Sequence, residues 1–137
     1  MRNPIVHFEI PADDEQRAMT FYQAVFDWQF QKFDMPNGEI YWCVTTTEVN
    51  EQGSPTKPGE INGGLMKRKM PDQPFMNYIQ AASIDASLQA IRANGGTVLM
   101  PKTEIAPNMG WFAVFRDTEN NIMGLHELSL QHKQPSS

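Results

Sequence analysis

The sequence states one pattern of predicted elements twice, and this duplication constrains the fold more than any other feature. Each copy opens with a short strand followed by acidic residues, which spans residues 6–14 in the first copy and residues 77–85 in the second. Aligning His7 with Tyr78 and Asp14 with Asp85 gives one shared offset of 71 residues (78 − 7 and 85 − 14). Repeated units of this size bury together what neither buries alone, so we expect a ligand site at the seam between them.

The first unit opens with a strand whose two faces differ in polarity. In residues 5–10, apolar side chains alternate with His7 and Glu9, which places these two residues on the face turned away from the core. Asp13 or Asp14 is expected to cap the helix that follows.

Apolar residues recur at intervals of three and four along this helix, which predicts a stripe that packs against the sheet as core. The stripe consists of Ala18, Phe21, Tyr22, Val25 and Phe26. Three more strands are expected at residues 28–33, 39–47 and 61–66, with a loop at 48–60.

The second unit repeats this order. A strand at residues 76–81 precedes a helix from Asp85 to about residue 93, and strands are expected at 97–101, 110–116 and 121–128. The offset becomes 69 where residues 26–28 match residues 95–97, and 60 where Gly64 matches Gly124 (124 − 64). The longer loop of the first unit accounts for most of this drift, because insertions fall in loops.

The composition is that of a globular protein. We expect one domain at residues 1–130, with modules at about 4–70 and 75–129 and a frayed polar tail at 131–137. Acidic residues outnumber basic ones by 16 to 11 and the formal charge is −5, so no nucleic-acid partner is expected. The sequence shows neither a signal-peptide pattern nor a membrane-spanning stretch, and its single cysteine, Cys43, is expected to be a buried, inert thiol. These features predict a cytoplasmic protein with no membrane partner.

Several segments together resemble one known superfamily. They are residues 7–14 (HFEIPADD), 18–28, 62–66 (NGGLM), 101–103 (PKT), 110–112 (GWF) and 117–121 (DTENN). The chain resembles the glyoxalase/bleomycin-resistance/dioxygenase superfamily, also called vicinal oxygen chelate, and in particular its small single-domain glyoxalase-like bacterial branch. The likeness extends over about residues 4 to 129.

The resemblance implies an α+β fold in which two βαβββ modules form curled mixed sheets around a U-shaped cleft. It also implies a homodimer. Metal-using relatives hold a divalent ion such as Zn, Ni or Fe with four ligands, two from each module, on the first and last strands. That ion chelates vicinal oxygens of the substrate and stabilises an enediolate.

When these positions are carried over one by one, only one of the four has a good metal-binding side chain. His7 occupies the first-strand position of the first module, whereas Tyr78, at the matching position, is a poor ligand at neutral pH. The last strands offer the Gly63–Gly64 pair and Gly124, which have no donor side chain. Because a metal site needs at least three protein donors, we expect no metal cofactor.

His7 then has two interpretations. It belongs to a metal site completed by Glu9 or His126, or it is a polar residue of a metal-free pocket. We favour the second, because His126 lies two residues beyond the expected ligand row, about 6 to 7 Å along the strand. Glu127 does not replace the missing donor, because its side chain points to the opposite face from Gly124.

The predicted pocket combines an imidazole, a carboxylate, a phenol and an amide around space left by glycine. His7 and Glu9 are the predicted catalytic residues. The predicted ligand-binding residues are Tyr78, Gln80, His126, Trp42 and Gly124. One of Tyr41 and Trp42, and one of Trp111 and Phe112, is expected to face inward.

Three functions follow from this pocket. The first is a metal-independent glyoxalase-like lyase or isomerase, in which His7 or Glu9 moves a proton on a small carbonyl or phenolic substrate. The second is a protein of the bleomycin-resistance type that sequesters a drug or metabolite, for which an acidic, aromatic cleft suits a planar cation. The third is a metal-dependent lyase, isomerase or dioxygenase, which the missing donors disfavour.

Overall fold

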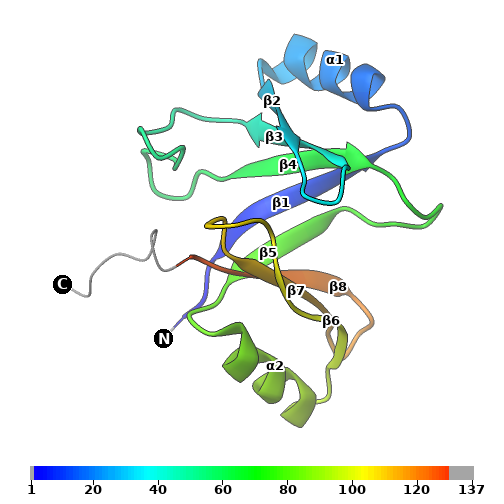
Figure 1. The fold of residues 1–137 in the computed structure, drawn as a ribbon, viewed down its shortest axis with the longest axis vertical. Helices are drawn as coiled ribbons and strands as arrows, with labels where there is room; N and C mark the ends of the chain where they lie inside the picture. Colours follow the sequence, from blue (N-terminus) through cyan, green and yellow to red (C-terminus); the bar gives the residue numbers. More distant parts are fainter. Residues whose placement is uncertain (1, 130–137) are drawn as a thin grey trace. The chain divides into compact units, whose positions relative to one another are not determined.

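The computed structural model describes residues 2–129, which form two compact units (Figure 1). We call residues 6–76 the first module and residues 77–129, with 2–5, the second module. Within the described residues, each module consists of one helix and four strands in the order βαβββ, so the predicted α+β class and the duplication are confirmed. The cleft between the two modules stays a prediction. The predicted tail at 131–137 lies outside the described residues.

The first module is a mixed sheet with one helix. Its elements are β1 (Ile5–Ala12), α1 (Glu15–Phe26), β2 (Gln29–Asp34), β3 (Ile40–Thr45) and β4 (Asn62–Lys67). The strands lie in the order β2-β3-β4-β1, in which β1 runs parallel to β4 and the other pairs are antiparallel. A helical crossover is the usual way to join strands of such a sheet, and here α1 follows β1 directly.

The second module repeats this topology. Its elements are β5 (Met76–Gln80), α2 (Ile84–Ala93), β6 (Thr97–Glu104), β7 (Trp111–Arg116) and β8 (Ile122–Glu127). The strands lie in the order β5-β8-β7-β6, and β5 runs parallel to β8. Neither described helix has the length and apolar character that crossing a bilayer requires.

The helix caps correct the alignment of the two modules. The Asp14 carboxylate accepts a hydrogen bond from the backbone N–H of Arg17, and the Ser83 hydroxyl accepts one from that of Ala86, so these residues are the two N-caps. Their offset is 69 residues (83 − 14) rather than 71. Asp14 therefore matches Ser83 and not Asp85.

Strand register gives the same correction. On β4 and β1 Gly64 pairs with Glu9, whereas on β8 and β5 Gly124 pairs with Tyr78. If Gly64 matches Gly124, then Tyr78 matches Glu9, again with an offset of 69 (78 − 9). The predicted equivalence of His7 and Tyr78 is wrong by two residues, and the position matching His7 is Met76.

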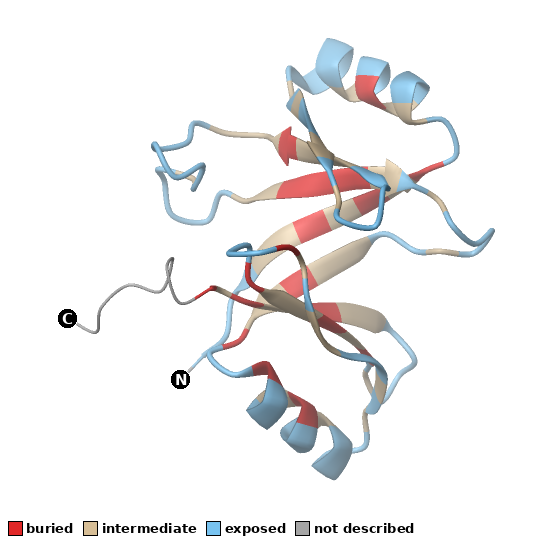
Figure 2. Ribbon diagram, viewed as in Figure 1, coloured by how far each residue is buried: buried red, intermediate tan, exposed pale blue. Residues whose placement is uncertain are grey.

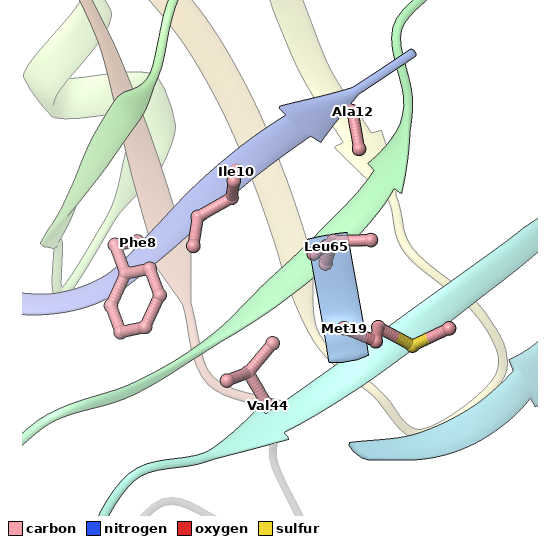
Figure 3. Packing of buried hydrophobic residues seen from close by; sticks show 6 residues of the cluster. All are labelled: Phe8, Ile10, Ala12, Met19, Val44 and Leu65. Atoms are coloured by element: carbon pink, nitrogen blue, oxygen red, sulfur yellow. The ribbon is translucent and has the colours of Figure 1, made fainter. Parts of the chain in front are cut away.

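A compact apolar cluster lies between α1 and the first-module sheet. It contains Phe8, Ile10, Ala12, Met19, Val44 and Leu65, as Figure 3 shows. Buried residues gather on the central strands of this sheet (Figure 2). Burial of this kind contributes about 25 cal/mol per Å² of apolar surface, and it fixes which face of the sheet is core.

The predicted core stripe of α1 is partly wrong. Met19 is the buried residue of the helix and Tyr22 is half-buried, but Phe21, Val25 and Phe26 are 55%, 56% and 56% exposed. At 3.6 residues per turn Phe21 lies about 160° around the helix from Met19, so the two side chains do not face the same sheet. Phe26 is the last residue of the helix.

Candidate functional site

The candidate site lies on the face of the first-module sheet that points away from α1. Side chains alternate along β1, so Phe8 and Ile10 enter the core while His7 and Glu9 project from the opposite face. On the neighbouring strands Tyr41 pairs with Met66, and Met66 pairs with Pro11, two residues after Glu9. Tyr41 therefore projects from the same face as His7 and Glu9.

Two polar side chains, His7 and Glu9, meet there at the hydroxyl oxygen of Tyr41. The Tyr41 hydroxyl lies 2.7 Å from His7 Nε2 and donates a hydrogen bond of 3.1 Å to Glu9 Oε2. His7 Nε2 and Glu9 Oε2 are 3.9 Å apart. Because a phenol carries one hydrogen, a hydroxyl that donates to Glu9 accepts from His7, which assigns a proton to Nε2. We call these three residues the His7–Tyr41–Glu9 array.

Gly64 makes room for this arrangement. A Cβ at Gly64 would lie 1.7 Å from the Tyr41 hydroxyl oxygen and 2.0 Å from Cζ, so the tip of the phenol occupies the space of a side chain. The space that the sequence predicted at this glycine is filled by Tyr41. The sequence leaves open whether Tyr41 or Trp42 faces inward and favours Trp42 as the ligand-binding residue, because the register of β3 against β4 is not readable from the chain.

The array is partly shielded from solvent. The His7 side chain is 31% exposed and the Glu9 side chain 18% exposed. Such a site excludes part of the water that would weaken its hydrogen bonds, while an outside molecule can still reach it. Both conditions suit a ligand site.

The second module brings together four of the predicted ligand-binding residues. Tyr78 pairs with Gly124 and Gln80 pairs with His126 across β5 and β8. The Tyr78 ring covers Gly124, where a Cβ would lie 2.3 Å from Cδ2. Burial lowers the pKa of His126, and the nearby Glu127 charge raises it by a smaller amount. A neutral imidazole is thereby favoured at this position.

Trp42 lies apart from the array. It packs against the core cluster of the first module, and its indole N–H donates to Glu15 Oε2 at 3.0 Å. It also borders an open hollow of about 430 Å³ at the start of α1. Of Tyr41 and Trp42, it is therefore Tyr41 that shares a face with His7.

The corresponding aromatic pair of the second module divides in the same way. Phe112 pairs with His126 and shares its face, whereas Trp111 packs against the core cluster of Ala81, Ile84 and neighbouring residues. Directly opposite residues of an antiparallel pair project from one face of the sheet. Phe112 is thus the aromatic residue beside His126.

Glu127 is buried on the face opposite to Gly124, as the alternation along its strand predicts. Its buried carboxylate accepts a hydrogen bond of 2.7 Å from the backbone N–H of Ile84 at the start of α2. Lys102 Nζ lies 3.5 Å from its other oxygen and 4.7 Å from the centre of the Trp111 ring. A carboxylate at a helix N-terminus stabilises the helix through its dipole.

Cys43 shares the face of the array but is only half-buried. It pairs with Gly64 on β4, and burial raises the pKa of its thiol. A raised pKa keeps the thiol protonated and weakens it as a nucleophile, in agreement with the predicted inert role.

This fold and this site define a small α+β protein of duplicated βαβββ modules with a polar array on one sheet. A family model described as "Bleomycin resistance protein-like N-terminal" matches residues 4–46. A "Glyoxylase-like domain-containing protein" of Didymella fabae is 30% identical over 125 residues, which cover 88% of this chain and 91% of that protein. The chain therefore belongs to the glyoxalase/bleomycin-resistance/dioxygenase superfamily.

Solved structures share the fold at low identity. A hypothetical protein from Bacillus halodurans C-125 matches with a TM-score of 0.69 and 14% identity, covering 100% of both chains. A methylmalonyl-CoA epimerase in complex with methylmalonyl-CoA and NH4+ matches with a TM-score of 0.69 and 15% identity, covering 97% of this chain and 99% of the other. A methylmalonyl-CoA epimerase from Mycobacterium tuberculosis gives a TM-score of 0.66 at 12% identity, with 93% and 89% covered. These likenesses establish the fold alone.

The residues present do not fit the superfamily's divalent metal. Two predicted ligand positions are Gly64 and Gly124, and tyrosine rings fill the space above both. Among residues 2–129, no three His, Cys, Asp or Glu side chains are grouped so that they could hold an ion. A divalent ion needs at least three such donors.

Proposed function

We propose that this protein binds a small carbonyl or phenolic molecule at the His7–Tyr41–Glu9 array and that His7 and Glu9 move a proton on it without a metal. The observation that carries the proposal is the meeting of an imidazole N–H and a carboxylate oxygen at one shared oxygen atom. A donor and an acceptor placed 3.9 Å apart can hold one ligand oxygen between them.

The chemistry of the two groups suits acid–base work. Imidazoles and carboxylates are the side chains that most often act as general acids and bases, and each must lie within hydrogen-bond reach of the proton that it moves. In the array His7 would donate its Nε2 proton to the oxygen of a carbonyl ligand while the Glu9 carboxylate removes a proton from the adjacent carbon, which gives an enol. Return of a proton to carbon and of the enol proton to His7 would restore both groups. Such transfer would make the protein a lyase or isomerase of the glyoxalase-like kind.

Hydrogen–deuterium exchange tests the proposal. Small enolisable carbonyl compounds and phenols are incubated with the protein in D2O, and uptake of deuterium at carbon is followed by NMR. The proposal predicts catalysed exchange for at least one compound, with a loss of about 10²-fold or more in His7→Ala or Glu9→Gln. Glu48→Gln, which changes an exposed carboxylate on a loop, is the matched control and should leave the rate unchanged. Equal rates in all four proteins would contradict it.

Sequestration without chemistry is the second candidate. The bleomycin-resistance-like model covers residues 4–46, the segment that contains His7, Glu9 and Tyr41. A protein of this kind would bind a drug or metabolite and release it unchanged. Binding that weakens in His7→Ala and Glu9→Gln, with no exchange or turnover in the unaltered protein, would favour this candidate over the first.

We further propose that the protein acts as a cytoplasmic homodimer. The proposal is supported by the superfamily resemblance and by the single cysteine, which fits a reducing compartment. Light scattering coupled to size exclusion measures the mass directly. A mass of one chain, 15.6 kDa, at micromolar concentration would contradict the dimer.

A further inference from the structure

The surroundings of the Tyr41 hydroxyl in the array suit one kind of ligand oxygen. The end of the phenol lies directly over Gly64, where any side chain would collide with it. The ring planes of His7 and Tyr41 are within 16° of each other. The space beside His7 is therefore flat. The Gly64 backbone lies on one side of it, and the Tyr41 ring and its hydroxyl occupy it.

Only one oxygen fits between the two polar groups. His7 Nε2 and Glu9 Oε2 are 3.9 Å apart, and the Tyr41 oxygen already bridges them at 2.7 and 3.1 Å. A ligand oxygen that bonds to both groups must take the place of the Tyr41 oxygen. The same two contacts would then select an oxygen that both accepts and donates a hydrogen bond, which is a hydroxyl.

We propose that the ligand of this site carries a hydroxyl on a planar, unsaturated carbon, as in a phenol or an enol. In the free protein the Tyr41 hydroxyl occupies the position of the ligand hydroxyl, and the ligand displaces it on binding. This inference rests on the proposed function, because it names the ligand class of the same His7 and Glu9 pair. Tyr41 is in this sense an internal mimic of the ligand. A hydroxyl on a tetrahedral carbon would place substituents outside the plane that the Tyr41 ring occupies, which lies within 16° of the His7 ring plane.

Removal of Tyr41 tests the proposal with a defined probe. In Tyr41→Ala, 4-methylphenol replaces the missing side chain, and its dissociation constant is measured by calorimetry or NMR titration. Toluene, which lacks the hydroxyl, and benzyl alcohol, whose hydroxyl is on a saturated carbon, are the matched probes. We expect 4-methylphenol to bind Tyr41→Ala about tenfold or more tighter than either matched probe, and about tenfold or more tighter than it binds the unaltered protein.

A second substitution locates the bound probe. In the double variant Tyr41→Ala/Gly64→Ala, the added methyl group occupies the place of the phenol edge, so binding should fall about tenfold or more. Equal binding of toluene and 4-methylphenol to Tyr41→Ala would overturn the proposal, because the hole would then recognise only apolar volume. Unchanged binding in the double variant would also overturn it.

The unaltered protein provides an independent measurement if Tyr41→Ala does not fold. With tyrosine labelled in the ring, saturation with 4-methylphenol should shift the Tyr41 signal and give a nuclear Overhauser contact between the probe and His7. An unmoved Tyr41 signal at saturation would overturn the displacement step. If phenols bind in this way while His7→Ala and Glu9→Gln leave isotope exchange unchanged, the ligand class stands and the proton transfer fails.

Discussion

Replacing Gly64 by alanine is the sharpest test of how the array is held. The new Cβ would lie 1.7 Å from the Tyr41 oxygen and 2.0 Å from Cζ, so the phenol must rotate away. The phenol then loses its hydrogen bonds to His7 and to the Glu9 carboxylate. A neutral bond contributes about 0.5–1.5 kcal/mol and a bond to a charged group about 1.5–3 kcal/mol, so the loss is about 2–4.5 kcal/mol.

A smaller effect opposes this loss. The backbone of Gly64 has no positive φ, so alanine fits its conformation. Alanine also lowers the entropy of the unfolded chain, which stabilises the folded state by about 0.4–1 kcal/mol. The net prediction for Gly64→Ala is a decrease of about 1–4 kcal/mol in the free energy of unfolding, measured by urea titration.

A double-mutant cycle separates the array from a general effect of the extra methyl group. In a Tyr41→Ala background there is no phenol to displace, so Gly64→Ala should change the free energy of unfolding by less than about 1 kcal/mol and can increase it. If Gly64→Ala costs the same in both backgrounds, Tyr41 does not occupy the space over Gly64. That result would contradict the position of Tyr41 in the array.

Three further predictions concern the rest of the chain. Burial lowers the pKa of His126 below 6.5, so the contribution of the neutral imidazole to stability is complete above pH 6.5 and is lost as the pH falls through the folded-state pKa. Between pH 7.5 and pH 5.5, urea titrations should show a larger decrease in the free energy of unfolding for the unaltered protein than for His126→Gln. Glu127→Ala removes the buried acceptor of the Ile84 N–H and should cost about 2–4 kcal/mol of unfolding free energy, whereas Asp85→Asn, at an exposed partner of Lys102, should cost less than about 0.5 kcal/mol. Protein purified without chelator should contain less than about 0.1 equivalent of Zn, Ni or Fe by mass spectrometry, since at least three donors are needed; a near-stoichiometric metal would contradict this.

The order of elements and the polar face of β1 could be predicted from the sequence because each depends on local alternation. The alternation predicts β1 at residues 5–10, and the strand extends to Ala12. Of the two candidate caps, Asp13 and Asp14, the structure has Asp14 as the N-cap. Strand β6 was predicted to end at residue 101 but continues to Glu104, beyond Pro101. An edge strand tolerates a proline because its missing N–H can face outward, and irregular register with β7 accompanies it.

Features that depend on long-range register could not be predicted in this way. The helix of the first module has more apolar residues than its sheet covers. The three- and four-residue spacing of these residues predicts that Phe21 and Val25 lie in the core, but both are exposed. The sequence pattern aligns the two modules two residues out of register, because a strand and a cap can each be matched at more than one offset. The contact of Tyr41 with His7 and Glu9 depends on the pairing of β3 with β4 and β1 and on the absence of a side chain at Gly64.

The central claim is that Tyr41 bridges His7 and Glu9 through one oxygen atom. Long-range ¹H–¹⁵N NMR of the His7 ring near neutral pH tests it most directly, because the hydrogen-bond pattern assigns a proton to Nε2. The predicted result is a protonated Nε2 whose signal shifts in Tyr41→Phe, where the hydroxyl is removed and the ring is kept. An Nε2 that carries no proton and is unaffected by Tyr41→Phe would contradict the account.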